Sequence, residues 1–326
     1  MAIWSQNVSV GNDNRDPSGA IEDAYPLSPL QKGILFHSLI AQGSGVYVEQ
    51  LLCDLNEAID DVALRQAWRT IIGRHPVLRT DFRWADLVEP QQQVHAHVGL
   101  PWDQRDWRGI SEAEQESRLA DLLVADRRRG LDPAQAPLFR LILIRRGEAR
   151  HSLIWTFHHV LLDGRSLVPI LREVFAYYEA SQTGSTLTLG LPRAYRDYID
   201  WISKRDFSKS EGFWRGTLAG FTEPTPLLVD HLLRADPKNA IGGGDHEIRL
   251  SAEITSALRS LAENAQLTLS TIVQGAWSLA LCRYSRESEV VFGVTRDCRR
   301  NTIEGAEGVI GLCINTLPIR VRDNPE

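Results

Sequence analysis

Apolar residues follow two different periods in the middle of the chain. Residues 138–145 and 151–158 are rich in β-branched, aromatic and aliphatic side chains, which predicts two central β-strands. Asp163 and Gly164 supply a turn signal, and apolar residues at helical spacing over 167–180 predict an amphipathic helix. The pattern therefore predicts a strand, a tight turn and a helix in succession.

Two adjacent histidines lie at the end of the second of these strands. At a period of two, His159 shares a face with Leu153 and Phe157, whereas His158 lies on the opposite face. A lone histidine in an apolar strand is more often a hydrogen-bonded core residue than a catalyst. One at a strand end beside a turn is nevertheless well placed for proton transfer, and the two histidines are expected to have different roles.

Helical spacing and strand-like alternation recur on both sides of this region. The pattern predicts further helices at 60–73, 112–129, 251–265 and 270–284, and a strand at 246–250. Residues 1–20 are rich in Asn, Asp, Ser and Gly without periodicity, and we expect a flexible leader there. The Gly, Thr and Ser residues of 181–190 mark the best candidate for a boundary between two lobes.

Composition and charge exclude several functional classes. The chain has 326 residues, of which 43% are hydrophobic and 24% charged, which is typical of a globular protein with one large or two medium cores. Its net charge of −6 argues against a nucleic-acid partner. The sequence has neither a long apolar run for a membrane span nor a signal peptide, so we expect a cytoplasmic protein.

The cysteines give no sign of a disulfide framework or a metal site. Cys53, Cys282, Cys298 and Cys313 are scattered and form no CxxC pair. We expect free thiols in a reducing compartment, and we expect no bound metal.

The spacing of two histidines, three residues and then Asp163-Gly164 is much rarer than a lone histidine. It resembles the His-His-x-x-x-Asp-Gly signature of condensation domains of nonribosomal peptide synthetases, which are related to chloramphenicol acetyltransferase-like acyltransferases. Other segments resemble further motifs of the family, in family order: Ser-Pro-Leu-Gln and Leu-Phe-His within 28–37, Arg-His-Pro-Val-Leu-Arg-Thr at 74–80, Tyr-Arg-Asp-Tyr-Ile-Asp-Trp at 195–201, and 309–321. The resemblance extends from about residue 21 to the end of the chain.

The resemblance implies an α/β fold of the chloramphenicol acetyltransferase type, with two lobes that meet in a V. We expect an N-terminal lobe at 21–180 that carries the histidine motif and a C-terminal lobe at 181–326. Family members continue well beyond this point, so the resemblance implies that the C-terminal lobe is incomplete. The activity of this portion alone is therefore in question.

The resemblance also implies a chemistry. Family members join an acyl group held as a thioester to the amine of an aminoacyl thioester, without a metal, a nucleotide or a bound cofactor. His159 is the implied catalytic residue, as a base or as an electrostatic partner of the reacting amine. His158 and Gly164 belong to the same motif. Asp163 is implied to be structural through a buried ion pair, for which Arg299 is the best-aligned partner and Arg296 or Arg79 are substitutes.

Arg165 occupies a position where many chain-elongating members carry tryptophan. It is either a surface residue or a side chain that shapes the donor pocket. Together with the leader, it favours a starter domain that takes a fatty acyl group from coenzyme A, with a peptidyl-condensing domain as the second choice. The implied partners are an aminoacyl or peptidyl carrier domain, with its phosphopantetheine arm, and an adjacent adenylation domain.

Two further hypotheses stay open. One is a catalytically silent domain that recruits carriers, for which a damaged histidine motif is expected, whereas the motif here is intact. The other is a free-standing O-acyltransferase of the same superfamily. The segments at 195–201 and 315–318 favour a synthetase domain over that alternative.

Overall fold

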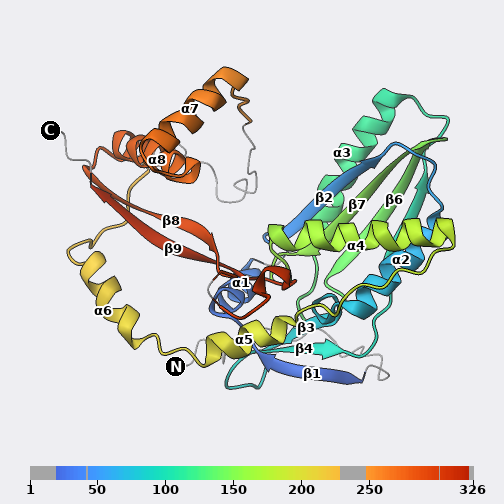
Figure 1. Ribbon diagram of the computed structural model, residues 1–326, viewed down its shortest axis with the longest axis horizontal. Helices are drawn as coiled ribbons and strands as arrows, with labels where there is room; N and C mark the ends of the chain where they lie inside the picture. The colour runs from blue at the N-terminus through green and yellow to red at the C-terminus, as the bar shows by residue number, and fades with distance from the viewer. Residues whose placement is uncertain (1–19, 42, 228–246, 301, 323–326) are drawn as a thin grey trace. The chain divides into compact units, whose positions relative to one another are not determined.

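The computed structural model describes residues 20–41, 43–227, 247–300 and 302–322. The chain divides into two compact units. The first unit comprises the chain up to Arg205 together with Asp297–Asn315. The second comprises Asp206–Arg296 together with the C-terminal segment from Thr316. Figure 1 shows the elements of both units.

A four-stranded mixed sheet forms the centre of the first unit. The order of its strands is β2-β7-β6-β5. β7 is antiparallel to both of its neighbours, whereas β5 runs parallel to β6. The strands are β2 (Val48–Leu55), β5 (Trp102–Asp106), β6 (Phe139–Gly147) and β7 (Arg150–His158), so the two central strands predicted from the sequence are confirmed.

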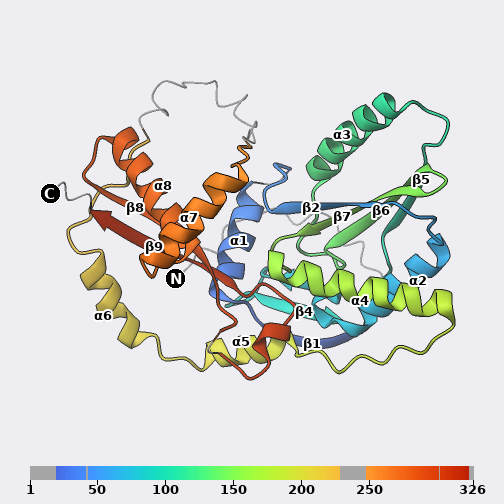
Figure 2. The same cartoon turned by 45° about the horizontal axis from the view of Figure 1, so that its top comes forward.

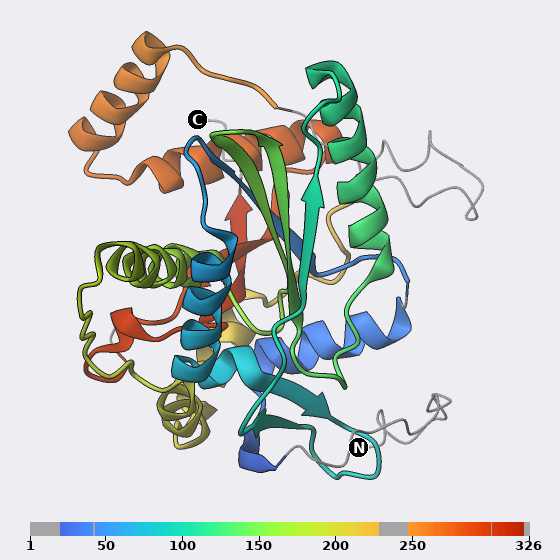
Figure 3. The same ribbon diagram turned by 90° about the vertical axis from the view of Figure 1, so that its right-hand side faces the viewer.

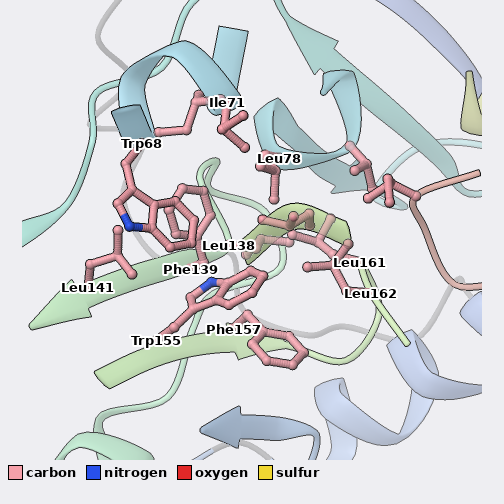
Figure 4. Packing of buried hydrophobic residues seen from close by; sticks show 14 of the residues in the cluster. Trp68, Ile71, Leu78, Leu138, Phe139, Leu141, Trp155, Phe157, Leu161 and Leu162 are labelled. Carbon is pink, nitrogen blue, oxygen red and sulfur yellow. The ribbon is translucent and has the colours of Figure 1, made fainter. Parts of the chain in front are cut away.

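Helices cover both faces of this sheet, as Figure 3 shows. α2 (Asp61–Arg74) and α4 (Gly164–Thr183) pack on one face and α3 (Glu112–Arg129) on the other. Because side chains alternate along a strand, β7 sends Trp155 and Phe157 into the α2 side and Ile154 into the α3 side. Trp155 meets Trp68 of α2 edge to face, with ring centroids 5.1 Å apart, at the centre of the core in Figure 4.

A second, smaller sheet lies in the same unit. Its strands pair antiparallel in the order β1 (Ile21–Pro26), β4 (Gln91–His95) and β3 (Thr80–Arg83). A 3-10 turn at Pro76–Arg79 leads directly into β3. α5 (Tyr195–Ser203) packs against β1 through a separate core that contains Tyr25, Tyr195 and Tyr198. α1 (Pro29–Ile40) begins at a capping box in which Ser28 and Gln31 bond to each other's backbone.

The second unit contains three helices and a two-stranded sheet among its described residues. The helices are α6 (Ser208–Thr217), α7 (Ala252–Asn264) and α8 (Leu269–Ser285), and the strands are β8 (Glu289–Asp297) and β9 (Ile314–Arg322). The two strands run side by side in Figure 2. At Gly293 of β8 a Cβ atom would lie 2.8 Å from Thr316 Cγ2, so the close approach of the strands needs a glycine there.

Most predicted elements are confirmed to within a few residues, but one strand is wrong. Residues 247–250 of the expected strand at 246–250 are not in a strand, and Ile248 and Leu250 are exposed, so their alternation has no apolar layer to cover. Residue 246 and nearly all of the expected leader at 1–20, residues 1–19, lie outside the described residues.

The boundary between the compact units differs from the lobe boundary expected at 180/181. Residues up to Arg205 stay with the first unit because α5 packs on β1. Asp297–Asn315 also joins that unit, because Arg299 and Cys313 bind the turn that follows β7. The α/β class itself is confirmed.

No described helix is long and apolar enough to cross a membrane. Within the same residues, no group of three or more His, Cys, Asp and Glu side chains is placed to hold a metal ion. Cys53, Cys282, Cys298 and Cys313 are all described, and none of them forms a disulfide.

Candidate active site around His158 and His159

The histidine motif lies where β7 gives way to α4. β7 ends at His158, residues 159–162 form the connection, and Asp163 caps the N-terminus of α4, which begins at Gly164. The predicted strand, turn and helix are therefore confirmed. The helix begins three residues earlier than its apolar pattern indicated, because the Asp163 side chain accepts a hydrogen bond from the backbone N–H of Ser166.

The backbone of this connection is held by several distant elements. The N–H of His158 donates to Leu138 O at 3.0 Å, and that of His159 donates to Tyr47 O at 2.8 Å. Gln31 of α1 donates from Nε2 to the carbonyl of Val160 at 3.0 Å. The position of the two histidines is thus fixed by three contacts that no local sequence rule predicts.

His159 is held in one tautomer. Its Nδ1 lies 2.8 Å from the carbonyl oxygen of Leu162. A carbonyl can only accept a hydrogen bond, so Nδ1 carries a proton, and in the neutral imidazole Nε2 keeps its lone pair. The side chain is partly exposed, and no described residue hydrogen-bonds to Nε2. Nε2 is therefore able to accept a proton from a ligand.

His158 has the opposite arrangement. It is buried, its Nδ1 accepts the N–H of Val160 at 3.1 Å, and its Nε2 lies 3.3 Å from Ser38 Oγ. Burial and, to a lesser extent, the nearby His159 lower the pKa of His158 to about 4. His158 is therefore neutral at physiological pH, and its hydrogen bonds tie the end of β7 to Val160 and Ser38.

The lowered pKa of His158 predicts a pH dependence of stability. In the unfolded chain its pKa returns to 6.5, so between pH 6.5 and about 4 the unfolded state binds more protons than the folded one, and stability falls as the pH falls. From this residue we expect a loss of about 3 kcal/mol in the free energy of unfolding between pH 7 and pH 4. Urea denaturation across that range measures it.

The His158→Gln variant should flatten this slope, because glutamine does not titrate. Part of the slope should stay, since burial also lowers the pKa of His75 and His151. An unchanged slope in the variant would contradict the burial of a neutral His158.

Asp163 and Arg299 form a fully hydrogen-bonded ion pair in the interior. Nη1 and Nη2 of Arg299 donate to Oδ2 and Oδ1 of Asp163, both at 2.9 Å, and the two side chains are 2% and 0% exposed. The carboxylate also accepts from the backbone N–H of Ser166 and Cys313 and from Ser166 Oγ. Both carboxylate oxygens of Asp163 are therefore occupied by hydrogen bonds from within the protein.

Arg299 extends the same network to the segment before β9. Its Nε donates to Val309 O and its Nη2 to Gly311 O, each at 3.1 Å. Burial alone would lower the pKa of Arg299, but hydrogen bonds and charge from Asp163 and Asp297 raise it above its ordinary value. The guanidinium therefore stays charged. Arg79, one of the substitutes considered, donates to Ile72 O and pairs with Glu22 instead.

Gly311 and Ser166 complete this network and were not singled out in the sequence. The Ser166 hydroxyl shares its one proton between Gly311 O at 2.9 Å and Asp163 Oδ1 at 3.1 Å, and its oxygen accepts the N–H of Gly311 at 3.0 Å. A Cβ on Gly311 would lie 2.2 Å from the ring of Tyr195, whose hydroxyl donates to Leu312 O. The signal that could have identified Ser166 is its spacing of three residues from an aspartate cap.

Gly164, the last residue of the motif, and Arg165, which follows it, are both exposed. Nη1 of Arg165 pairs with Asp297 Oδ2 at 2.6 Å, and its side chain is 56% exposed. The same Asp297 accepts from Arg299 Nη1 at 3.0 Å through Oδ1, so it joins the exposed arginine to the buried one. Gly164 has no described atom within 4 Å of a Cβ position, and packing gives no reason for a glycine there.

A family model matches nearly the whole chain. The model described as "Condensation domain" matches residues 21–326. The chain belongs to the condensation-domain family. Condensation domains of nonribosomal peptide synthetases are acyltransferases that form amide bonds.

Several curated relatives of this condensation domain are large peptide synthases. One of the linear gramicidin synthase subunits of Brevibacillus parabrevis is 43% identical over 305 residues, which cover 93% of this chain and 4% of that protein. Bacitracin synthase 3 of Bacillus licheniformis is 33% identical over 307 residues, which cover 94% of this chain and 5% of the relative. The chain therefore spans a small part of the synthases it matches.

Solved structures show the same fold. The starter condensation domain of rhizomide synthetase superposes with a TM-score of 0.74 at 20% identity, covering 93% of this chain and 67% of that one. The first condensation domain of the calcium-dependent antibiotic synthetase gives a TM-score of 0.73 at 18% identity, with 93% and 71% covered. At these identities the likeness establishes the fold alone.

Proposed function

We propose that this condensation domain forms an amide bond between a thioester-bound acyl donor and the α-amine of an aminoacyl acceptor carried on a phosphopantetheine arm. The observation that carries the proposal is the tautomer of His159, in which Leu162 O holds the Nδ1 proton and Nε2 is left unoccupied. A silent recruiting domain would not need a histidine in this arrangement.

The proposed reaction needs a positioned proton acceptor and little else from the protein. The amine nitrogen attacks the thioester carbonyl carbon, a C–N bond forms, and the C–S bond breaks with the thiolate as leaving group. The proton lost by the nitrogen passes to Nε2 of His159 and then to the departing sulfur, so each cycle returns the enzyme unchanged. Holding the two substrates together lowers the barrier further, by about 7–11 kcal/mol in well-oriented systems.

Asp163 has a different role in this proposal. Its carboxylate is held by Arg299 and by backbone N–H groups, so it anchors the start of α4 and the connection that carries His159. We expect it to act on the rate only through the position of His159. His158 acts in the same indirect way, through its bonds to Val160 and Ser38.

The donor that we propose is an acyl or peptidyl group on a carrier domain. Segments 40–43% identical to this chain occur in three different subunits of linear gramicidin synthase, and recurrence in several subunits of one synthase suits a step that is repeated. A carrier domain and an adenylation domain in the same synthetase are the partners that this reaction requires.

A starter domain that takes fatty acyl groups from coenzyme A is the second candidate. The observation that favours it is Arg165, which stands directly after the motif and is fixed by the carboxylate of Asp297. Its exposed guanidinium could contact a donor that lies along the motif. The same exposure also suits an ordinary surface residue, and for that reason the carrier-bound donor is preferred.

A donor competition assay separates the two candidates. With an aminoacyl carrier as acceptor, we expect product from a peptidyl carrier donor at a rate at least about 10-fold above that from acyl-coenzyme A. A preference for acyl-coenzyme A would instead establish the starter candidate. No amide product from any donor in the full synthetase module would contradict the proposed function itself.

The Arg165→Ala variant sharpens this test. If Arg165 limits a donor pocket, its removal opens space for methylene groups worth about 0.8 kcal/mol each when buried, or about fourfold in preference per methylene. With a carrier-bound donor as proposed, we expect the acyl-length profile to stay within about twofold of the wild type. A shift towards longer acyl chains would favour the starter candidate.

A further inference from the structure

Tyr47 has an unusual backbone conformation next to the candidate active site. Its φ is +62°, in the left-handed region that residues other than glycine and asparagine rarely adopt. Gly43 and Gly45, in the same loop, also have positive φ values, of +73° and +72°. The chain therefore uses glycine twice where this loop turns left-handed, but keeps a tyrosine at the third position, which indicates that the tyrosine side chain is needed there.

Tyr47 connects His159 to α1 through its backbone carbonyl on one side and its phenol on the other. Its carbonyl accepts the backbone N–H of His159 at 2.8 Å, one residue beyond the last β2–β7 pair, Val48 with His158. Its phenol lies 3.0 Å from Nδ1 of His37 on α1. The two rings are nearly parallel, with centroids 6.3 Å apart and an interplanar angle of 12°.

The other end of α1 holds the carbonyl of the residue that follows His159. Gln31 donates to the carbonyl of Val160 at 3.0 Å, and its own side chain is fixed by Ser28 and Gln92. α1 thus reaches the backbone on both sides of the His159 side chain, directly through Gln31 and indirectly through His37 and Tyr47. The bond from Nδ1 to Leu162 O orients the ring but leaves the backbone position to these contacts.

We propose that Tyr47 is a positioning residue for His159 and that His37 is its anchor. The proposal rests on the proposed function in one respect, that His159 Nε2 accepts the proton of the reacting amine. The left-handed backbone aims the Tyr47 carbonyl at the N–H of His159, and the bond to His37 keeps the tyrosine in that conformation. Without this anchor the loop relaxes, and the imidazole loses its alignment with the substrate.

Two measurements on the Tyr47→Phe and His37→Ala variants and their double variant test the proposal. Hydrogen exchange at the backbone amide of His159, followed by NMR, should become at least about 10-fold faster in each. The single-turnover rate of amide formation at saturating substrate should fall about 10-fold. The KM measured in the steady state should be unchanged, because substrate binding is not affected. The double variant should fall no further than either single one, because both changes break the same bond.

The Tyr47→Gly variant separates the side-chain anchor from backbone strain. Glycine adopts the same φ without strain, but the variant loses the packing of the Tyr47 ring on the hydrophobic core, so some loss of heat resistance is expected from packing alone. Its rate should fall as in Tyr47→Phe, because the anchor to His37 is lost in both. Tyr178→Phe is the matched control. Its hydroxyl accepts a hydrogen bond from Asp60 N between α4 and α2, so its loss should change neither the His159 amide nor the rate.

The outcomes distinguish this inference from the proposed function. Unchanged exchange at His159 in Tyr47→Phe and His37→Ala, or additive rate effects in the double variant, would overturn the positioning role while leaving the function standing. If the wild-type domain forms no amide with any donor, the function fails, and the exchange rates alone still decide whether Tyr47 holds His159.

Discussion

Replacing His159 by alanine is expected to lower the single-turnover rate of amide formation by about 10²–10⁴-fold, the range typical of a lost general base. The change removes Nε2, which is the unoccupied acceptor of the motif, together with the bond from Nδ1 to Leu162 O. The side chain is partly exposed, so the melting temperature should change little. Rapid-quench kinetics with saturating substrates and a thermal melt measure the two quantities.

His97→Ala is the control for loss of an imidazole. His97 is exposed and follows β4, and its removal should change neither the rate nor the melting temperature. A His159→Ala domain that turns over within about threefold of the wild type, under conditions where the chemical step limits, would remove His159 from the proton transfer.

Replacing Asp163 by alanine should have the largest effect on stability. The change leaves the buried Arg299 guanidinium with Asp297 as its remaining carboxylate partner, and it removes the acceptor of the Cys313 N–H. Breaking one partner of such a pair typically costs about 3–5 kcal/mol. We expect a decrease of that size in the free energy of unfolding, measured by urea denaturation at pH 7.

Arg165→Ala is the matched control because Arg165 and Arg299 share Asp297 as a partner. The Arg165 pair is exposed, so its loss should cost at most about 1 kcal/mol. A second comparison is Asp163→Leu with Arg299→Met, which removes both charges and should recover part of the loss of the single variant. Equal destabilisation by Arg165→Ala and Asp163→Ala would contradict the structural assignment of the buried pair.

The parts of the site that could be predicted from the sequence are those in which side chains follow a local pattern. The run of β-branched, aromatic and aliphatic residues predicted β7, and apolar residues at helical spacing predicted α4, although from residue 167 and not from Gly164. The pairing of Asp163 with Arg299 came from a resemblance to a family, and the structure places the two side chains 2.9 Å apart. The structure also buries His158 and leaves His159 partly exposed.

The parts that could not be predicted depend on backbone groups brought from elsewhere in the chain. The carbonyls of Tyr47 and Leu162 hold His159, and a carbonyl is present in every residue, so no residue type marks it in advance. The positive φ of Tyr47 has no sequence signal either, because its residue type argues against it. The error at 247–250 has a related cause, since alternation predicts a strand only where a partner strand and an apolar layer exist.

Intact-mass analysis of an aminoacyl carrier domain after one turnover tests the central claim most directly. The donor acyl group is loaded on a second carrier, and wild-type and His159→Ala proteins are compared in the setting of the full synthetase module. We predict that with the wild type the acceptor carrier gains the mass of the acyl group while the donor carrier returns to its free thiol, and that His159→Ala leaves both carriers loaded as before. Transfer at equal extent by both proteins, or loss of the donor acyl group to water without any gain by the acceptor, would contradict the account.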